Sequence, residues 1–378
     1  MDDEIKINRG LRGVYFERSS ISSIDGTKGE LYYRGYSIDD LAKYSTFEEV
    51  AYMLIFGELP NQNDLIEFQN KLKKHRTIPK EIHKIIENLK DGHPMDVLRT
   101  SVSALASLDQ SSQSFSESAF IENGLKLTSQ IPTIIASHNS IRNGNKPVDP
   151  NPDFTHASNW LWMLKGEKPS QEASKLADID FILHAEHGSN ASSFAARTTI
   201  GTNANLHAAF VTAISTLAGP AHGGAAEDVM KMLQDIGTPE NVKTYILEKR
   251  KKREPITGFG HRVYKVEDPR AKHMKEGVKK VSIEMGEPKW FNILEALVKE
   301  MKPFSRHGLN VNVDFYSGAL YKLHNIPPDL FVPIFAIGRV PGWIIQCIEQ
   351  LRNNILIRPL TLYNGPKPRK YIPISQRK

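Results

Sequence analysis

With 378 residues, of which 40% are hydrophobic, the chain can bury one or two cores at roughly 100–200 residues per domain, which excludes a disordered protein. Its single cysteine, Cys347, excludes an internal disulfide and a cysteine-based zinc cluster, and lies in an apolar run as a small core residue. A net charge of +6 favours an anionic partner, either a nucleic acid or a small phosphorylated molecule.

Targeting signals are not apparent in the sequence. The acidic start, Met1-Asp2-Asp3-Glu4, has no apolar run behind it and predicts neither a secretory nor a transit peptide. No apolar stretch is expected to approach the roughly 20 residues that span a bilayer. We therefore expect a cytoplasmic protein with no membrane partner.

The predicted elements are almost all helical. Short β-like pieces surround Gly13-Val14-Tyr15 and residues 30–33, and Ser37 to Asp40 resembles a capping box for one helix that runs to Phe56. Further helices are predicted over residues 61–74, 79–89, 95–108, 114–140, 156–164, 170–187, 225–235, 239–252, 268–284, 288–301, 315–323 and 328–353. Since strands and helices do not alternate and no repeat is visible, the sequence predicts an all-α fold.

Residues 191–216 differ from the other helical stretches. They are rich in Ala, Ser and Thr and nearly free of charge. Small uncharged side chains let helices approach closely, so this stretch predicts buried helix packing and is a candidate subunit interface.

One histidine stands in a turn before a helix-forming run, in Gly219-Pro220-Ala221-His222-Gly223-Gly224-Ala225. We expect His222 at a helix N-terminus, where the dipole disfavours imidazolium and favours a neutral ring that donates a hydrogen bond. The two glycines would let a ligand approach the backbone. Taken alone, the motif is equally compatible with a helix start that exposes a histidine.

Three further motifs accompany this one. They are His184-Ala185-Glu186-His187-Gly188-Ser189-Asn190, then Thr257-Gly258-Phe259-Gly260-His261-Arg262 with Asp268-Pro269-Arg270, and Asn310-Val311-Asn312-Val313-Asp314. In this order and spacing, the four motifs resemble the citrate synthase family. The resemblance extends from Gly10-Leu11-Arg12-Gly13 to Ile357-Arg358-Pro359 and so covers nearly the whole chain.

The resemblance implies a two-domain helical fold with the active site in the interdomain cleft. Residues 1–222 and 319–378 would form a large, dimer-forming domain, and residues 223–318 an inserted small domain. The chain has no long N-terminal extension, which resembles the shorter dimeric members of the family. We therefore expect a homodimer.

The chemistry in question joins the methyl group of a thioester to a ketone. Methyl deprotonation needs a carboxylate base and a donor to the enolate oxygen, and Asp314 and His222 suit these tasks. His261 suits donation to the ketone oxygen. The resemblance implies that these three residues are catalytic in a citrate synthase, an acyltransferase of the tricarboxylic acid cycle that condenses acetyl-CoA with oxaloacetate.

The other ligands follow from the substrates. Oxaloacetate is a dicarboxylate, which arginine binds in bidentate fashion. Arg270 follows Asp268-Pro269, a predicted N-cap and first helical position, with a surface ion pair as the alternative; Arg339 interrupts an apolar run, where an unpaired charge would be costly. The resemblance implies that oxaloacetate contacts His187, Arg270, Arg339 and, across the dimer interface, Arg358. Candidates for CoA are Arg262, Lys265, Lys367, Arg369 and Lys370.

Other functions stay open at this stage. A metalloenzyme would use the histidines of these motifs, but their spacing is not that of a zinc motif, and we expect no metal and no cofactor, since the CoA thioester is a substrate. A nucleic-acid binder would rest on the basic run 249–253 alone, so we expect no nucleic-acid partner. A 2-methylcitrate synthase would use propionyl-CoA with the same machinery. One methylene in a pocket is worth only about 1–3 kcal/mol, and the sequence does not separate these two activities.

Overall fold

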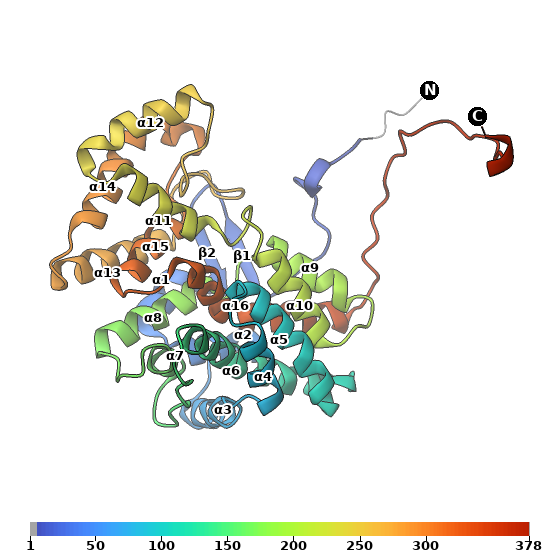
Figure 1. Cartoon of the computed structure of the whole chain (residues 1–378), viewed down its shortest axis with the longest axis horizontal. Coiled ribbons are helices and arrows are strands. Elements are labelled where there is room, and N and C mark those ends of the chain that lie inside the picture. Colours follow the sequence, from blue (N-terminus) through green and yellow to red (C-terminus); the bar gives the residue numbers. More distant parts are fainter. Residues whose placement is uncertain (1–5, 378) are drawn as a thin grey trace.

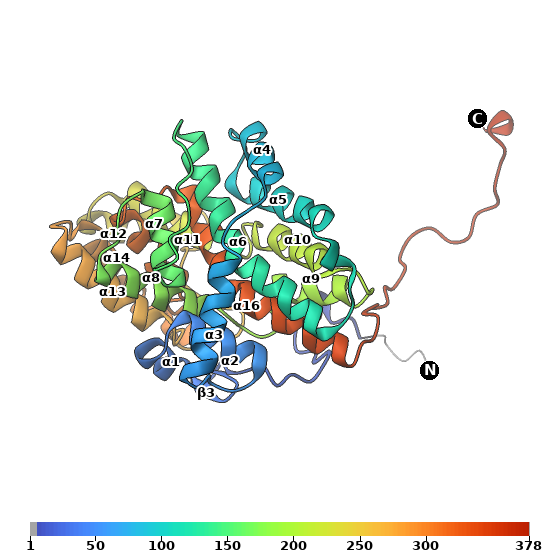
Figure 2. The same ribbon diagram turned by 90° about the horizontal axis from the view of Figure 1, so that it is seen from below.

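The computed structural model describes residues 6–377 and folds them into sixteen α-helices and one small β-sheet (Figures 1 and 2). The helices are α1 (Ile38–Tyr44), α2 (Phe47–Phe56), α3 (Gln62–Lys74), α4 (Lys80–Asn88), α5 (Pro94–Leu108), α6 (Glu117–Arg142), α7 (His156–Lys165), α8 (Gln171–His184), α9 (Ala191–Ile200), α10 (Leu206–Leu217), α11 (Ala225–Ile236), α12 (Val242–Lys251), α13 (Ala271–Glu284), α14 (Lys289–Met301), α15 (Asp314–Leu323) and α16 (Phe331–Arg352). The predicted all-α fold is confirmed.

The single helix expected from Ser37 to Phe56 is wrong, because two separately capped helices replace it. Ser37 Oγ accepts the N–H groups of Asp39 and Asp40 and so caps α1. The capping box lies instead at α2, where Thr46 and Glu49 satisfy each other's backbone N–H groups. Two residues, Ser45 and Thr46, therefore separate these helices.

The sheet consists of β1 (Ser22–Asp25), β2 (Glu30–Tyr33) and β3 (Tyr36–Ser37), joined antiparallel in that order. The β-like piece at residues 30–33 is confirmed. The piece at Gly13-Val14-Tyr15 is wrong: a 3₁₀ turn over Arg9–Leu11 precedes it, and Gly13 has a φ of 74°. A residue in that left-handed region breaks an extended strand.

Helix α16 lies at the centre of the fold and packs against α6, α8, α9 and α10. The segment Pro328–Arg352 is long and apolar enough to cross a membrane by length and composition, which corrects the expectation that no stretch approaches that length. Its most apolar window is 100% buried inside the protein. Burial by neighbouring helices is what a core helix requires, so its apolar length is explained by the fold.

The stretch 191–216 forms two helices, α9 and α10, that pack against each other. Ala196, Ala209 and Ala213 are fully buried, and Thr199 Oγ1 lies 3.0 Å from Thr212 Oγ1 across the pair. The predicted close helix packing is confirmed, and its role in a subunit interface stays a prediction.

Helices α11 to α15 form a group of their own, at the left of Figure 1. α15 packs against α11 and α13, and α14 against α12. This grouping is compatible with an inserted domain over residues 223–318. Helix α15 crosses the expected boundary, since it begins at Asp314 and ends at Leu323. The domain division itself stays a prediction.

The last residues leave the body of the molecule. After α16 the chain runs extended and largely exposed, and Figures 1 and 2 show it projecting away from the helices. This segment carries several large apolar side chains, among them Leu360 (85% exposed) and Tyr371 (76% exposed). These side chains have no core to pack on in the single chain.

Candidate active site

Two loops come together where α8 ends and where α13 begins. The buried His187 follows α8, and its Nε2 lies 3.1 Å from the hydroxyl of Tyr264. The rings of His187 and His261 are 5.2 Å apart. Burial and the charge of Arg270 hold the pKa of His187 well below its usual value, so this ring is neutral. Residues more than seventy positions apart in the sequence therefore form one site.

His261 lies in a loop, and its hydrogen bonds define the tautomer of its ring. Its Nδ1 accepts the backbone N–H groups of Val263 at 3.0 Å and Tyr264 at 3.2 Å. Burial, followed by the charge of Arg270, lowers the pKa of His261 to about 4. A neutral ring with Nδ1 as acceptor carries its proton on Nε2. His261 therefore presents an Nε2–H donor.

His222 is not at the start of its own helix. His222 lies in a turn after α10, and α11 begins only at Ala225. The prediction that His222 stands at the N-terminus of the following helix is therefore wrong. Its Nε2 instead faces the first turn of α9, where it accepts the backbone N–H of Ser192 at 3.3 Å. Burial and the charge of Arg339 lower the pKa of His222 to about 4. The predicted neutral ring follows, with its proton on Nδ1.

Asp314 is the first residue of α15, one position earlier than predicted. A β-bridge between Phe259 and Val311 holds the His261 loop beside the segment that leads into Asp314. The backbone N–H of Gly260 reaches Asn310 O at 2.7 Å and strengthens this contact. The segment that leads into Asp314 is therefore held by this bridge and by backbone hydrogen bonds, among them that of Asn312 N–H to Gly258 O at 3.1 Å.

The carboxylate of Asp314 makes no hydrogen bond or ion pair with any residue in the range 6–377. Burial raises the pKa of this carboxyl, and the charges of His184 and Arg270 oppose the rise. An unpaired carboxylate with a raised pKa is a stronger base than an exposed one. These properties suit proton abstraction.

Arg270 is buried, with only 4% of its surface exposed, so the surface ion pair considered from sequence is wrong. Its Nε and Nη2 donate to the two carboxylate oxygens of Asp268 at 2.9 and 2.7 Å. Helix α13 begins at Ala271, so Asp268-Pro269 is a turn before the helix, with Asp268 accepting the N–H of Arg270 at 3.1 Å, and not its cap. The charge on Asp268 raises the pKa of Arg270 and keeps the guanidinium ionised.

Arg339 is 1% exposed, and its Nε donates to the carbonyl of His184. Its Nη1 is buried and has no partner within the described part of the chain. Burial lowers the pKa of Arg339 to about 10, which leaves it charged at neutral pH. A buried, charged donor without a partner is costly, so the site is built to receive an anionic acceptor.

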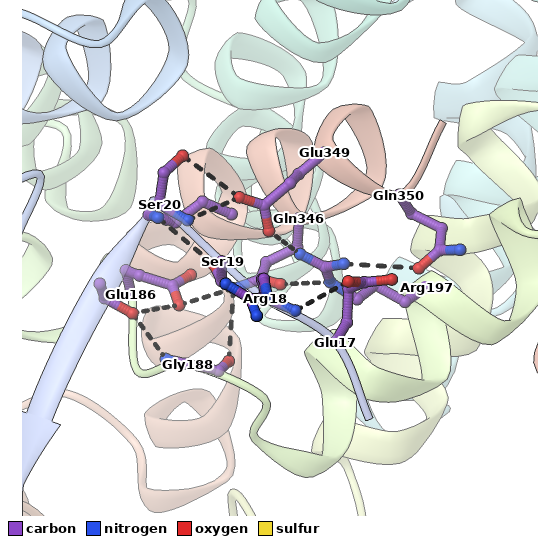
Figure 3. Close-up of polar contacts among 12 residues, drawn as sticks. Glu17, Arg18, Ser19, Ser20, Glu186, Gly188, Arg197, Gln346, Glu349 and Gln350 are labelled. Carbon is purple, nitrogen blue, oxygen red and sulfur yellow. Dashed lines mark hydrogen bonds and ion pairs between the residues drawn. The ribbon is translucent and has the colours of Figure 1, made fainter. Parts of the chain in front are cut away.

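Glu186 is a site residue to which sequence reasoning assigned no role. Its Oε1 accepts Gln346 Nε2 at 2.8 Å and Ser22 Oγ at 3.2 Å. Figure 3 shows how Gln346 links it to Arg197, which also binds Glu349. Burial raises the pKa of Glu186 to about 7, although the charge of Arg339 opposes this. The sequence feature that could have identified Glu186 is its position between two histidines, His184 and His187.

The proposed CoA residues and the proposed cross-subunit residue lie in two places, the His261 loop and the C-terminal tail. Arg262 and Lys265 are exposed on the His261 loop, and Arg262 Nη2 reaches Gly10 O at 3.1 Å. The exposed tail carries Arg358, Lys367, Arg369 and Lys370, which the structure of the single chain does not bring to the histidines. Their roles stay predictions.

The assembled groups can perform a defined set of tasks. Two neutral imidazoles present N–H donors, one carboxylate can accept a proton, and buried arginines can bind carboxylates. Within residues 6–377, no three His, Cys, Asp or Glu side chains are grouped so as to hold a metal ion. The arrangement suits enolisation of a carbonyl compound beside a bound anion.

Comparison with known proteins gives consistent matches over the full length. A family model described as citrate synthase, C-terminal domain, matches residues 10–360. The chain is 42% identical to citrate synthase from Synechocystis sp., covering 100% of this chain and 96% of that protein. It is 43% identical to citrate synthase 2 of Bacillus subtilis (98% and 99% covered) and 37% identical to 2-methylcitrate synthase 1 of Corynebacterium glutamicum (98% and 99%).

Solved structures agree with these matches. The crystal structure of citrate synthase from Pyrobaculum aerophilum superposes with a TM-score of 0.93 at 38% identity, covering 98% of this chain and 95% of that one. A ternary complex of citrate synthase from Thermoplasma acidophilum with carboxymethyl coenzyme A and oxaloacetate gives a TM-score of 0.93 at 28% identity, covering 98% and 100%.

Proposed function

This chain belongs to the citrate synthase family, and we propose that it condenses acetyl-CoA with oxaloacetate and water to give citrate and CoA. The observation that supports this proposal most directly is Arg339, a buried cation with an unpartnered Nη1. It interacts electrostatically with Asp314 and lowers the pKa of His222. A dicarboxylate ligand would supply the missing acceptor beside the groups that enolise the thioester.

In the first step, Asp314 removes a proton from the methyl group of acetyl-CoA. The electrons move onto the thioester oxygen, where the Nδ1–H of His222 stabilises the enolate. A neutral imidazole suits this task, because its N–H can donate a hydrogen bond to the developing oxyanion while the ring itself carries no charge. Proton removal and enolate stabilisation are thereby coupled.

In the second step, the enolate carbon attacks the ketone carbon of oxaloacetate. The ketone oxygen becomes an alkoxide, which the Nε2–H of His261 stabilises. Arg270, Arg339 and His187 hold the two carboxylates of oxaloacetate. Water then hydrolyses the citryl thioester and releases CoA, with citrate as the product.

The second candidate is 2-methylcitrate synthase, with propionyl-CoA as donor. It is favoured by the 37% identity to 2-methylcitrate synthase 1 of Corynebacterium glutamicum over 98% of this chain. Both reactions need the same base and donors, and the difference is one methylene in the acyl pocket.

The test is kcat/KM for acetyl-CoA and propionyl-CoA at saturating oxaloacetate. We expect acetyl-CoA to be preferred by at least about tenfold, the scale that one methylene allows. Preference for propionyl-CoA would instead establish the second candidate. Turnover of neither thioester would contradict both.

The proposal extends to assembly. The active species would be a homodimer in which the tail of each chain reaches the other's site and delivers Arg358. The cleft between residues 223–318 and the rest would close on oxaloacetate before acetyl-CoA binds. Basic side chains near the cleft, Arg262 and Lys265 with Lys367, Arg369 and Lys370 of the tail, would contact the CoA phosphates.

A further inference from the structure

Trp343 connects the central helix to the candidate enolate donor. It is fully buried on α16, and its Nε1 donates to Ser192 Oγ at 3.1 Å. The same Oγ lies 2.9 Å from Nε2 of His222. Two hydrogen bonds thus separate the indole from the imidazole, although Trp343 and His222 are 121 positions apart in the sequence.

The hydrogen-bonding capacity of Ser192 limits how this network can be arranged. A serine hydroxyl has one proton and two lone pairs. The indole N–H occupies one lone pair, and Asn190 Oδ1, at 2.9 Å, can only accept. Asn190 Oδ1 already accepts the N–H of Ser193 at 3.1 Å, as the N-cap of α9. A carboxamide oxygen can accept two hydrogen bonds, so Asn190 Oδ1 and His222 Nε2 compete for the one hydroxyl proton of Ser192, and the backbone of Ser192 decides between them.

The backbone N–H of Ser192 favours His222 Nε2 as an acceptor. This N–H, in the first turn of α9, points to His222 Nε2 at 3.3 Å. A protonated Nε2 would meet this N–H head-on at the positive end of a helix. The backbone N–H therefore favours a lone pair on Nε2 and the proton on Nδ1, and the hydroxyl proton of Ser192 then turns to that same lone pair at 2.9 Å.

We propose that Trp343 is a positioning residue that fixes the Nδ1–H tautomer of His222 by anchoring and polarising the Ser192 hydroxyl. Donation from Trp343 fixes the position of Oγ and makes its O–H a stronger donor to Nε2, since linked hydrogen bonds strengthen one another. A stronger bond at Nε2 makes Nδ1–H a better donor. The catalytic consequence rests on the proposed function, in which Nδ1–H meets the enolate oxygen.

The placement on α16 has a structural reason. Trp343 lies four residues after Arg339, so both side chains project from the same face of one buried helix. The indole packs edge-on against Phe210 of α10, with centroids 5.5 Å apart. The helix that carries a proposed oxaloacetate ligand thus also orients the proposed enolate donor.

The test replaces Trp343 with phenylalanine in the full-length protein, with Trp162→Phe as the matched control. Trp162 lies on α7, and its Nε1 also donates a hydrogen bond, to the backbone carbonyl of Asp149 at 2.9 Å. We expect Trp343→Phe to lower kcat about tenfold and to change KM for oxaloacetate little, because one hydrogen bond to an active-site group is lost. Trp162→Phe should leave kcat unchanged.

A spectroscopic readout separates positioning from a merely structural role. With ¹⁵N-labelled histidine, the ring signals of His222, assigned by their loss in His222→Asn, should show Nδ1–H alone in the wild-type chain. Trp343→Phe should show a mixture of tautomers. Nε2–H in the wild-type chain, or one unchanged tautomer in Trp343→Phe, would overturn the proposal.

Two further variants keep the test decisive. In a Ser192→Ala background, Trp343→Phe should lower kcat no further, whereas independent effects that multiply would count against the relay. If Trp343→Phe unfolds, benzothienylalanine at position 343 keeps the bicyclic shape and removes only the N–H. If the wild-type enzyme condensed neither thioester, the proposed function would fail, while the tautomer measurement would still decide the role of Trp343.

Discussion

Burial sets the protonation state of each group in the candidate site. It lowers the pKa of His222 and His261 to about 4, so both rings are neutral donors at pH 7. It raises the pKa of Asp314, which increases the basicity of that carboxylate. The same loss of water thus lowers the pKa of an imidazolium and raises that of a carboxylic acid, and both shifts suit the proposed reaction.

At Asp314, substitution by asparagine keeps the shape of the side chain but removes the proposed base. We expect kcat to fall by about 10²–10⁴-fold, the scale of general base catalysis. Oxaloacetate affinity should be retained, because a carboxylate contributes no attraction to a dianion. Steady-state kinetics with calorimetry of oxaloacetate binding check both. The control is Asp235→Asn, an exposed carboxylate of α11, and near-normal turnover of Asp314→Asn would place the base elsewhere.

The dependence of kcat on pH follows from the same shifts. The base is active when ionised, so kcat should fall as pH drops through the raised pKa of Asp314, with a midpoint above the usual 3.8. His222 and His261 become charged only near pH 4, so they should not produce a step near pH 6.5. Glu186 has a pKa of about 7 and interacts with Arg339, so its ionisation should change the affinity for oxaloacetate. The measurement is made at saturating oxaloacetate, so that a change in affinity does not alter the observed rate. A step in kcat near pH 6.5 would instead show that turnover depends on a histidine whose pKa is not shifted.

Among the elements, α16 decides where Arg339, a proposed oxaloacetate ligand, lies. Gly338 and Gly342 face α8 and the segment after it, and a Cβ at Gly342 would stand 2.2 Å from Ala185 O. Without these side chains the helix approaches closely enough for Arg339 to bind the carbonyl of His184. The glycine spacing thus serves packing and the site together.

Gly342→Ala should therefore damage both stability and binding. The added methyl meets backbone that cannot yield, so we expect at least about 1–3 kcal/mol of destabilisation. KM for oxaloacetate should rise, because α16 and Arg339 move away from the site. Thermal unfolding and kinetics measure the two effects. In Gly277→Ala, the methyl would meet only the flexible Leu176 Cδ2, and this variant should behave nearly as wild type. Equal behaviour of the two variants would refute the close-packing account.

For the whole molecule, the exposed tail is the feature that a single chain leaves unexplained. The tail projects away from the body (Figure 2), and it exposes large apolar side chains at positions 360 and 371 and basic ones at 367 and 369. A homodimer in which each tail lies on the partner would bury the apolar groups and deliver Arg358 to the other site.

Mixed dimers test this arrangement. Arg358→Leu and Asp314→Asn should each be nearly inactive as homodimers. A hybrid of the two would contain one intact site, formed by Asp314 of one chain and Arg358 of the other, and should recover about half of wild-type activity. Differently tagged chains, co-expressed and purified in tandem, allow the measurement. An inactive hybrid would place Arg358 in its own chain's site, and an active monomer in sedimentation would refute the dimer.

The sequence by itself determined the helical fold and most helix positions, and its resemblance to the citrate synthase family pointed to the proposed site residues other than Glu186. Caps such as Asn61 and Ser170 and the apolar spacing along each helix act within a few residues, so they are readable locally. The pairing of Arg270 with Asp268 is equally local, although its burial is not.

Only the tertiary structure decided the protonation and orientation of the site. The neutrality of His222 comes from burial, Arg339 and the first turn of α9, and not from the helix that follows it in sequence. The contact of Trp343 with Ser192 joins residues 151 positions apart. Such contacts depend on how whole helices pack, and local sequence patterns carry no information about the partner that a buried polar atom will meet.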